Sequence, residues 1–242
     1  MGVRRVATLG IAGLLVVAGA ACSPAREAVP APPGADDRAR DALVAAYGRS
    51  LAVSHTVESQ SAGRTSRAVL DPATESGLLT LREVLADGTT TLTAETRRIA
   101  DDTWIQATGF DTVDADTWIH VDSERTVGSV LAVDTSEMTE GFTRSLLEVR
   151  GAVPLYSGTL LLPGTRGAQF GHAEAASLAP FTATADDRGR VTSLTIEANS
   201  LIGLDAVRTT ISGFEAPVSV AAPPATEVVE GTDEMLATFG IN

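Results

Sequence analysis

Apolar and polar side chains alternate with a period of two residues along several stretches of this chain. In 89–100, Leu92 and Ala94 fall on one side, while threonines and charged residues fall on the other. The stretches 191–198 and 205–213 alternate in the same way. One apolar and one polar face is typical of antiparallel strands that pack against a core on one side only. The chain therefore has to form a large antiparallel sheet and cover its apolar face.

Turn signals separate the alternating stretches. The sequence 186–190, Asp-Asp-Arg-Gly-Arg, lies between two of them and predicts a hairpin turn. Glycine suits such a turn because it adopts a positive φ without steric cost. The pair Asp87-Gly88 marks a second turn.

The tetrapeptide Asp-Thr-Trp-Ile occurs twice, at 102–105 and 116–119, and contains both tryptophans of the chain. Alternation places Trp104 and Trp118 on the more polar face and the isoleucine after each on the other. We interpret the pair as a hairpin, because aromatic residues are frequent in strands. The alternative is a two-tryptophan clamp for a ligand.

Two stretches have helical spacing instead. The first begins at Asp36 or Asp37, either of which can cap it, and its repeating positions are Leu43, Ala46, Tyr47, Ser50 and Leu51. The second covers 138–149 and ends at Gly151. Its apolar positions are Met138, Phe142, Leu146 and Val149.

A shorter helical piece is expected at 173–178, within an otherwise irregular stretch from Pro163 to Pro180. The inventory is then about eight to ten strands and two or three helices. So few helices cover a large sheet only if the sheet curls around them, and such curved sheets commonly leave an apolar cavity. The predicted fold class is α+β: a large, curved, open antiparallel sheet with helices over its concave face.

The start of the chain has the form of an export signal. Arg4 and Arg5 precede sixteen mostly apolar residues, 6–21, which span about 24 Å as a helix and fall short of a bilayer core of about 30 Å. The sole cysteine, Cys22, follows Gly19-Ala20-Ala21. This arrangement resembles the lipobox of bacterial lipoproteins, although a larger aliphatic residue usually stands where Gly19 is. Ordinary cleavage that leaves Cys22 incidental is the alternative.

These features divide the chain into three parts. Residues 1–21 are the signal, 22–35 are the lipidated cysteine and a proline- and alanine-rich tether, and 36–242 are a single domain. After removal of the signal, 31 acidic residues oppose 16 arginines (18 less two), a net charge of −15. Such a field repels nucleic acid and anionic headgroups, so membrane attachment has to come from the Cys22 lipid.

No catalytic or metal motif stands out. His55, His120 and His172 are isolated in sequence, and none lies in a His-Glu-x-x-His spacing. A Ser–His–Asp set assembled from distant positions is the remaining enzymatic alternative. The aspartates at 111, 114 and 116 lack the glycine and distal glutamate of a calcium loop, which favours a solvated loop. We predict neither a metal nor a cofactor, and no enzymatic activity.

Several segments are similar to the LolA/LppX/LprG-like lipoproteins of actinobacteria. They are "DDTWIQ" followed by "DTWIHVD", then "ATADDRGRVTSLTI", and the closing "APVSVAAPPATEVVE". The resemblance covers most of 36–230 and implies an unclosed β-barrel with an apolar lining that binds a lipid or another acyl-bearing molecule. It carries no catalytic motif. Residues 231–242 extend past the matched segments.

Two function classes follow. In the first, the protein is anchored at the outer face of the cytoplasmic membrane and carries or chaperones a lipid or glycolipid in an apolar cavity. In the second, the same fold is an envelope interaction or sensing module that contacts a partner protein. A core packed shut by Phe142, Phe181 and the leucines would favour the second. The candidate cavity residues are Ile105, Ile119, Met138, Phe142, Leu146, Val149, Leu194, Ile196, Val207 and Ile211.

Overall fold

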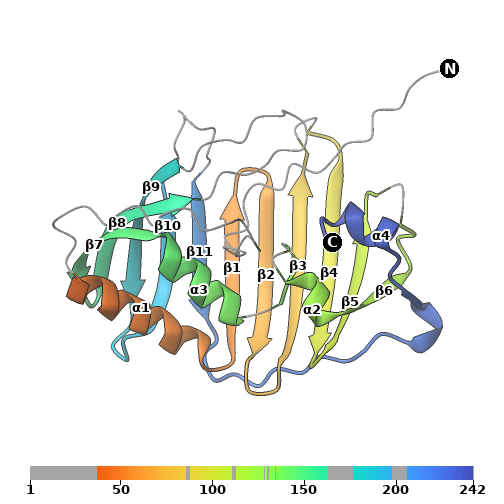
Figure 1. The fold of residues 1–242 in the computed structure, drawn as a ribbon, viewed down its shortest axis with the longest axis horizontal. Helices are drawn as coiled ribbons and strands as arrows, with labels where there is room; N and C mark the ends of the chain where they lie inside the picture. Colours follow the sequence, from red (N-terminus) through yellow and green to blue (C-terminus); the bar gives the residue numbers. More distant parts are fainter. Residues whose placement is uncertain are drawn as a thin grey trace, which may run out of the picture.

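The computed structural model describes residues 37–85, 88–110, 113–127, 129, 131–133, 135–162, 177–197 and 206–241. They form one sheet with helices on one side of it (Figure 1). The helices are α1 Asp37–Leu51, α2 Ser123–Thr126, α3 Thr135–Ser145 and α4 Asp233–Thr238, with a 3-10 turn, η2, at Ala225–Glu227.

The sheet has twelve strands in the order β12-β6-β5-β4-β3-β2-β1-β11-β10-β9-β8-β7. Their bounds are β1 His55–Ser61, β2 Arg64–Asp71, β3 Ser76–Val84, β4 Thr91–Ile99, β5 Asp102–Thr108, β6 Trp118–Asp122, β7 Leu146–Ala152, β8 Leu155–Leu162, β9 Ser177–Ala185, β10 Val191–Ile196, β11 Val207–Ser212 and β12 Val228–Glu230. The two edge strands, β12 and β7, do not pair with each other, so the sheet is open. This confirms the predicted fold class.

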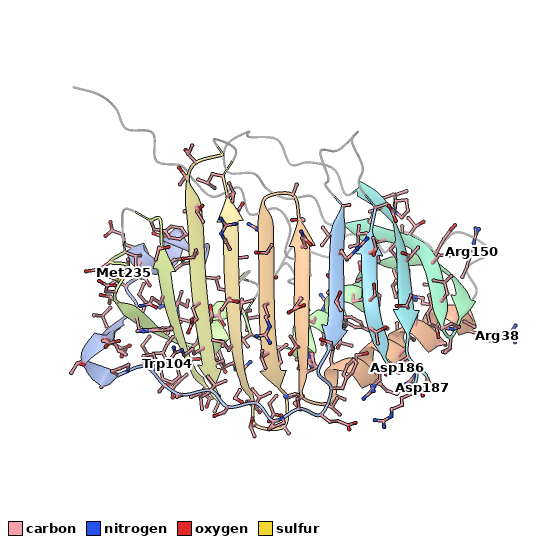
Figure 2. The ribbon with its side chains drawn as sticks, turned by 180° about the vertical axis from the view of Figure 1, so that it is seen from behind. Arg38, Trp104, Arg150, Asp186, Asp187 and Met235 are labelled. Atoms are coloured by element: carbon pink, nitrogen blue, oxygen red, sulfur yellow. The ribbon has the colours of Figure 1, made fainter. Side chains whose placement is uncertain are left out.

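Direct pairing places one residue of each central strand on a common face. The row runs across β11, β1, β2, β3, β4, β5 and β6 as Ile211, Val57, Ala68, Leu79, Thr96, Ile105 and Ile119. All seven are buried. We call this side of the sheet the inner face and the opposite side the outer face. The helices lie over the inner face, as Figure 1 shows. Figure 2 is turned by 180° and shows the outer face.

The buried residues form two separate apolar clusters. The α1–α3 cluster combines the apolar side of α1 and Phe142 of α3 with inner-face residues of β1–β3 and β7–β11. The C-terminal cluster combines inner-face residues of β3–β6 with side chains from the end of the chain, Leu236, Phe239 and Ile241. The middle strands contribute to both clusters, with Ala68 of β2 in the first and Ala94 of β4 in the second.

Helix α1 confirms the predicted opening helix. The five residues that repeat at helical spacing are all buried, together with Ala39. Its side chains also reach distant parts of the chain: Arg40 Nη2 donates to the carbonyl of Thr143 at 3.1 Å, and Ser50 Oγ donates to that of Val191 at 3.0 Å. These bonds fix α1 against both α3 and β10.

The second predicted helix is only half right. Helix α3 ends at Ser145, and Leu146 and Val149 belong to strand β7. Pairing with β8 shifts between Leu146 and Glu148, which is a β-bulge. The extra residue brings Leu146 and Val149, three positions apart, onto the same face, so the bulge imitates helical spacing. Gly151 does not end a helix either; it lies in β7 with φ of 99°.

The doubled tetrapeptide is a hairpin, as predicted. Strands β5 and β6 are antiparallel, and Ile105 lies opposite Ile119 on the inner face. Trp104 and Trp118 lie on the outer face, but Trp104 is opposite His120 rather than the second tryptophan. Trp118 is nevertheless buried, because the Arg97 guanidinium stands 4.4 Å above its ring.

The remaining predictions divide between the described residues and the rest. The irregular stretch was expected to reach Pro180, but β9 begins at Ser177, so 177–180 are strand. The expected helical piece at 173–178 otherwise lies outside the described residues, as do the signal, Cys22 and the tether. The structure has more strands than expected. Part of the difference comes from β12, which has only three residues, and from β7, whose apolar residues have helical spacing. In the described part of the chain, no helix has the length and apolar character needed to cross a bilayer.

Candidate functional site

The ten predicted cavity residues do not gather in one place. Seven belong to the α1–α3 cluster, and Met138 packs against it while remaining partly exposed. Ile105 and Ile119 belong to the C-terminal cluster instead. All except Met138 are buried. That these residues line a ligand cavity stays a prediction.

The α1–α3 cluster is packed around three aromatic rings. The rings of Tyr47 and Phe142 are 4.4 Å apart between centroids, and Phe142 meets Phe181 edge-on at 6.4 Å. Burial raises the pKa of Tyr47 to about 12, so its hydroxyl stays neutral at physiological pH. Edge-on and offset pairs of this kind add to the energy of area burial. The three rings pack together between α1, α3 and β9.

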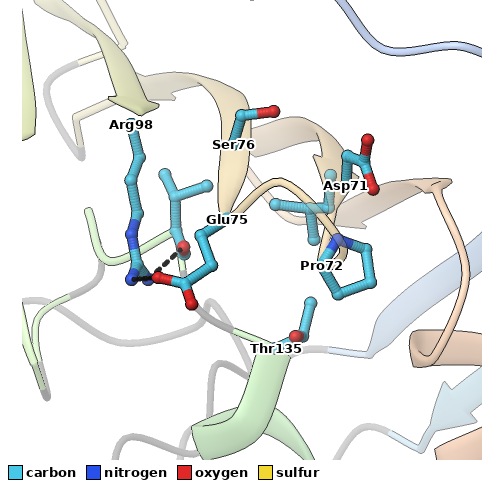
Figure 3. Close-up of a pocket in the computed structure, with 8 residues that line it drawn as sticks. Asp71, Pro72, Glu75, Ser76, Arg98 and Thr135 are labelled. Atoms are coloured by element: carbon cyan, nitrogen blue, oxygen red, sulfur yellow. Dashed lines mark hydrogen bonds and ion pairs between the residues drawn. The ribbon is translucent and has the colours of Figure 1, made fainter. Parts of the chain in front are cut away.

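An open pocket of about 260 Å³ lies where α3 begins over the inner face (Figure 3). Its apolar lining comes from Leu70 at the end of β2 and from Val133, both members of the α1–α3 cluster. The rest of its lining, polar except for Pro72, comes from the β2–β3 turn, from β4 and from the first residue of α3: Asp71, Pro72, Glu75, Ser76, Arg98 and Thr135. An apolar floor below a polar rim suits an amphipathic ligand.

The rim of the pocket is held by Arg98. Its Nε donates to the carbonyl of Ala100 at 2.9 Å, its Nη1 donates to that of Val133 at 3.1 Å, and its Nη2 lies 3.6 Å from the Glu75 carboxylate. Glu75 and Ala100 have φ of 49° and 53°, a conformation that few non-glycine residues adopt. Such residues cluster at functional sites, where the surroundings hold them in place.

Gly77 sets how closely the floor can be packed. A Cβ atom at this position would stand 2.4 Å from Cγ1 of Val133 and 2.8 Å from Cδ2 of Leu70. The absence of a side chain therefore lets Val133 rest directly on β3. Sequence reasoning did not find this pocket. The signal available was the turn-forming sequence Asp71-Pro72 with Gly77 beyond it, but its partners are more than 20 residues away.

A second hollow, of about 240 Å³, lies over β11, β1 and β2. Every side chain that lines it is polar or charged: Glu58, Ser59, Gln60, Thr65, Ser66, Arg67, Arg208 and Thr210. Arg67 and Glu58 form an exposed ion pair at 3.2 Å. Without an apolar wall this hollow is unsuited to an acyl chain.

Polar groups are also buried beneath the inner face. Arg64, 3% exposed, pairs with Glu83 through Nη2, while its Nε and Nη1 have no hydrogen-bond partner. The hydroxyl of Thr96 is likewise buried and unpaired. Unpaired buried donors are costly, so the middle of the sheet is less stabilised than its two apolar ends.

The described histidines have opposite environments. His55 is buried with Nδ1 2.7 Å from the carbonyl of Val53, and burial lowers its pKa although that hydrogen bond opposes the shift. His120 lies on the outer face between Asp102, at 2.8 Å, and Glu230, at 3.0 Å. Burial lowers the pKa of His120, but the hydrogen bonds and charges of the two carboxylates outweigh it, and the pKa is raised.

These contacts bear on catalysis. Both ring nitrogens of His120 are engaged by carboxylates, so neither is placed to activate a hydroxyl. His172 and Asp111 lie outside the described residues. Asp114 accepts a hydrogen bond from the amide of Asp116 at 3.1 Å, as in a turn. Within the described ranges, there is no group of three or more histidine, cysteine or acidic side chains that could hold a metal ion.

The geometry defines an open α+β sheet with an apolar inner face, helices over that face and an amphipathic pocket beneath α3. No family model and no curated protein sequence matches the chain. Among solved structures, it is similar to the crystal structure of LprF from Mycobacterium bovis, with a TM-score of 0.48 and 13% identity over 78% of this chain and 98% of that one.

Proposed function

We propose that this protein is a lipid-anchored, extracytoplasmic carrier or chaperone that binds an acyl-bearing ligand, a lipid or glycolipid, between the inner face and its helices. The observation that carries the proposal is the pocket beneath α3. Its floor, Leu70 and Val133, is continuous with the largest apolar cluster of the molecule. The acyl chain of a ligand that enters here would reach the apolar floor, Leu70 and Val133, while its polar end stays at the rim.

The size of the pocket limits what it holds. Its volume, about 260 Å³, is slightly below that of sites that enclose a whole drug-sized ligand, about 300–1,000 Å³. The pocket therefore receives one end of a long ligand and serves as an entrance to the inner face. Each buried methylene contributes about 0.8 kcal/mol, so a chain drawn further inwards gains affinity without a charged anchor.

The anchor is the second part of the proposal. A lipid on Cys22 would hold the folded domain at the outer face of the cytoplasmic membrane, with 22–35 as the spacer. Cys22→Ser should then release the protein from the membrane fraction, and the unchanged protein should incorporate labelled palmitate. Equal membrane association of both forms would remove the anchor from the proposal.

Native mass spectrometry of protein purified gently from membranes, followed by lipid extraction, tests for the ligand. Thr135→Trp should fill the pocket and lose the lipid, because Thr135 lines it at the start of α3. Glu140→Trp is the matched control, since Glu140 is on the exposed side of the same helix. Absence of lipid from the unchanged protein would reject the carrier function, and lipid retained by both variants would reject the pocket beneath α3 as the ligand site.

One observation favours the alternative function, an envelope interaction or sensing module. The Tyr47–Phe142–Phe181 packing closes the α1–α3 end, as expected of a domain that stores no ligand there. In that case the lipid extract is empty, and Thr135→Trp changes neither binding nor stability. Crosslinking in intact membranes would then identify the partner protein.

A further inference from the structure

The end of the chain covers the C-terminal cluster with only a few buried side chains. Within 231–241, which we call the C-terminal plug, three side chains are buried: Leu236, Phe239 and Ile241. Met235 is partly buried, and the ring of Phe239 meets Phe110 edge-on at 5.4 Å. The other side chains of the plug are half-buried or exposed. Its apolar contact with the sheet therefore depends on Leu236 within the six-residue helix α4 and on Phe239 and Ile241 after it.

The polar contacts of the plug are of two kinds. Some are internal: Phe239 and Ile241 donate their amides to the carbonyl of Leu236 at 2.9 and 3.0 Å, and these bonds remain when the plug moves. Others tie it to the sheet: the Gly231 amide donates to the His120 carbonyl at 2.8 Å, and Arg125 pairs with an exposed Asp233. Surface ion pairs of this kind contribute little to stability.

The strands beneath the plug pair with one another without any plug residue. Strands β4, β5 and β6 are hydrogen-bonded to one another in antiparallel pairs that include no plug residue. Their inner face at this end is apolar, with Ile105, Ala107, Ile119 and Val121 all buried. Lifting the plug would expose a continuous apolar strip on an intact sheet, and exposed apolar strips are typical of binding sites.

We propose that the C-terminal plug is displaceable and that the strip beneath it is a second acyl-binding site, closed in the free protein by Leu236, Phe239 and Ile241. The ligand class, a long acyl chain, is the one in the proposed function, on which this inference rests. The place is different, because the pocket beneath α3 borders the other cluster. An acyl chain would replace the three plug side chains with chemically similar surface.

Hydrogen exchange of the unchanged protein tests whether the plug opens by itself. The amides of Phe239 and Ile241 should exchange at least a hundredfold faster than those of β5, with little dependence on denaturant, because opening exposes little surface. Exchange at the rate of β5, with the same denaturant dependence, would show that the plug unfolds only with the whole domain and would overturn the proposal.

Palmitate is the probe for the site. Saturating palmitate should accelerate exchange of the plug amides at least tenfold, and should do so in Thr135→Trp as well. If Thr135→Trp abolishes palmitate binding and the plug amides never respond, the carrier function stands and the plug proposal falls. If palmitate accelerates exchange of the plug amides in both proteins while Thr135→Trp retains native lipid, the pocket beneath α3 is not the ligand site.

A variant that opens the plug gives an independent readout with cis-parinaric acid, a fluorescent fatty acid. Leu236→Asp should bind it at least tenfold more tightly than the unchanged protein, because the new carboxylate leaves the apolar strip. Ala237→Asp, on the exposed side of α4, is the matched control and should bind like the unchanged protein. A folded Leu236→Asp without added binding overturns the proposal; if this variant does not fold, the exchange result decides.

Discussion

The two ends of the inner face are covered by different means. At one end, α1 and α3, of 15 and 11 residues, close over an aromatic core, and hydrogen bonds from α1 reach both α3 and strand β10. At the other end, the cover is the C-terminal plug, which has the six-residue helix α4, three buried apolar side chains and an exposed ion pair. One sheet can therefore combine an integral core and a removable cover, and the length of the covering element distinguishes them.

The largest expected difference between the two ends is in the free energy of unfolding that is lost when a phenylalanine is replaced by alanine. Phe142→Ala should lower the free energy of unfolding by about 3–5 kcal/mol, as large truncations in rigid cores do. Phe239→Ala should cost less than about 2 kcal/mol, because a weakened plug can open without unfolding the sheet. Urea denaturation of both variants measures the pair; equal losses would mean that both ends are integral core.

A tryptophan introduced at the closely packed α1–α3 end should lower stability more than one introduced at the pocket beside it. Leu146→Trp adds a large ring where the exposed fraction is only 3% and should destabilise the domain by about 1–3 kcal/mol. Thr135→Trp has a hollow to enter and should change the melting temperature little. A melting temperature unaffected by Leu146→Trp would reveal unfilled space in the α1–α3 cluster.

The two ends should also respond to pH in opposite directions. His55 has a lowered pKa, so stability at its end should fall as the pH drops below about 6.5, where the unfolded chain takes up a proton more readily. His120 has a raised pKa, so its bridge between Asp102 and Glu230 should be complete below about pH 6.5 and weaken as the pH rises through the folded pKa.

The groups around His120 support that direction. Asp102 on β5 and Glu230 on β12 contact the ring, Asp122 is two residues along β6, and Arg97 on β4 stands over the neighbouring Trp118. NMR titration of the two imidazoles, with hydrogen exchange at β1 and β12 between pH 5.5 and 8, follows both ends. Parallel changes at the two ends would contradict the assignment, and His120→Gln should abolish the response at β12.

The smallest expected effect is that of the ion pair at the start of the plug. Arg125→Ala removes the 2.8 Å contact with Asp233, which is almost fully exposed, and should cost no more than about 1 kcal/mol. Global unfolding should be nearly unchanged, while the plug amides exchange slightly faster. A larger global loss would show that the plug and sheet unfold together.

Local periodicity predicted most of the sheet. Alternation identified β4, β10 and β11, and the glycine turns between strands were placed correctly because turn chemistry is also local. The spacing of Leu146 and Val149 misled the helix prediction, since a bulge and a helical turn both bring residues three apart onto one side. Only pairing with β8, a tertiary contact, decides between them.

The candidate site was less accessible to such reasoning. The pocket joins Leu70 to Arg98 and Thr135, which come from a strand end, a neighbouring strand and a helix start. No local period connects these positions. The ten predicted cavity residues divide between two clusters, and the cluster that each one joins depends on which cover lies above its strand.

The parallel pairing of β12 with β6 has a consequence for the order in which the molecule is completed. Glu230 lies 110 positions after its partner His120, and the plug follows it. Every strand beneath the plug is synthesised before the residues that cover it. Because contacts of such long sequence separation form late, the newly made chain passes through a stage in which β4–β6 are paired and their apolar side is bare. That interval is when the protein is most exposed to aggregation, and when a passing lipid would meet least competition.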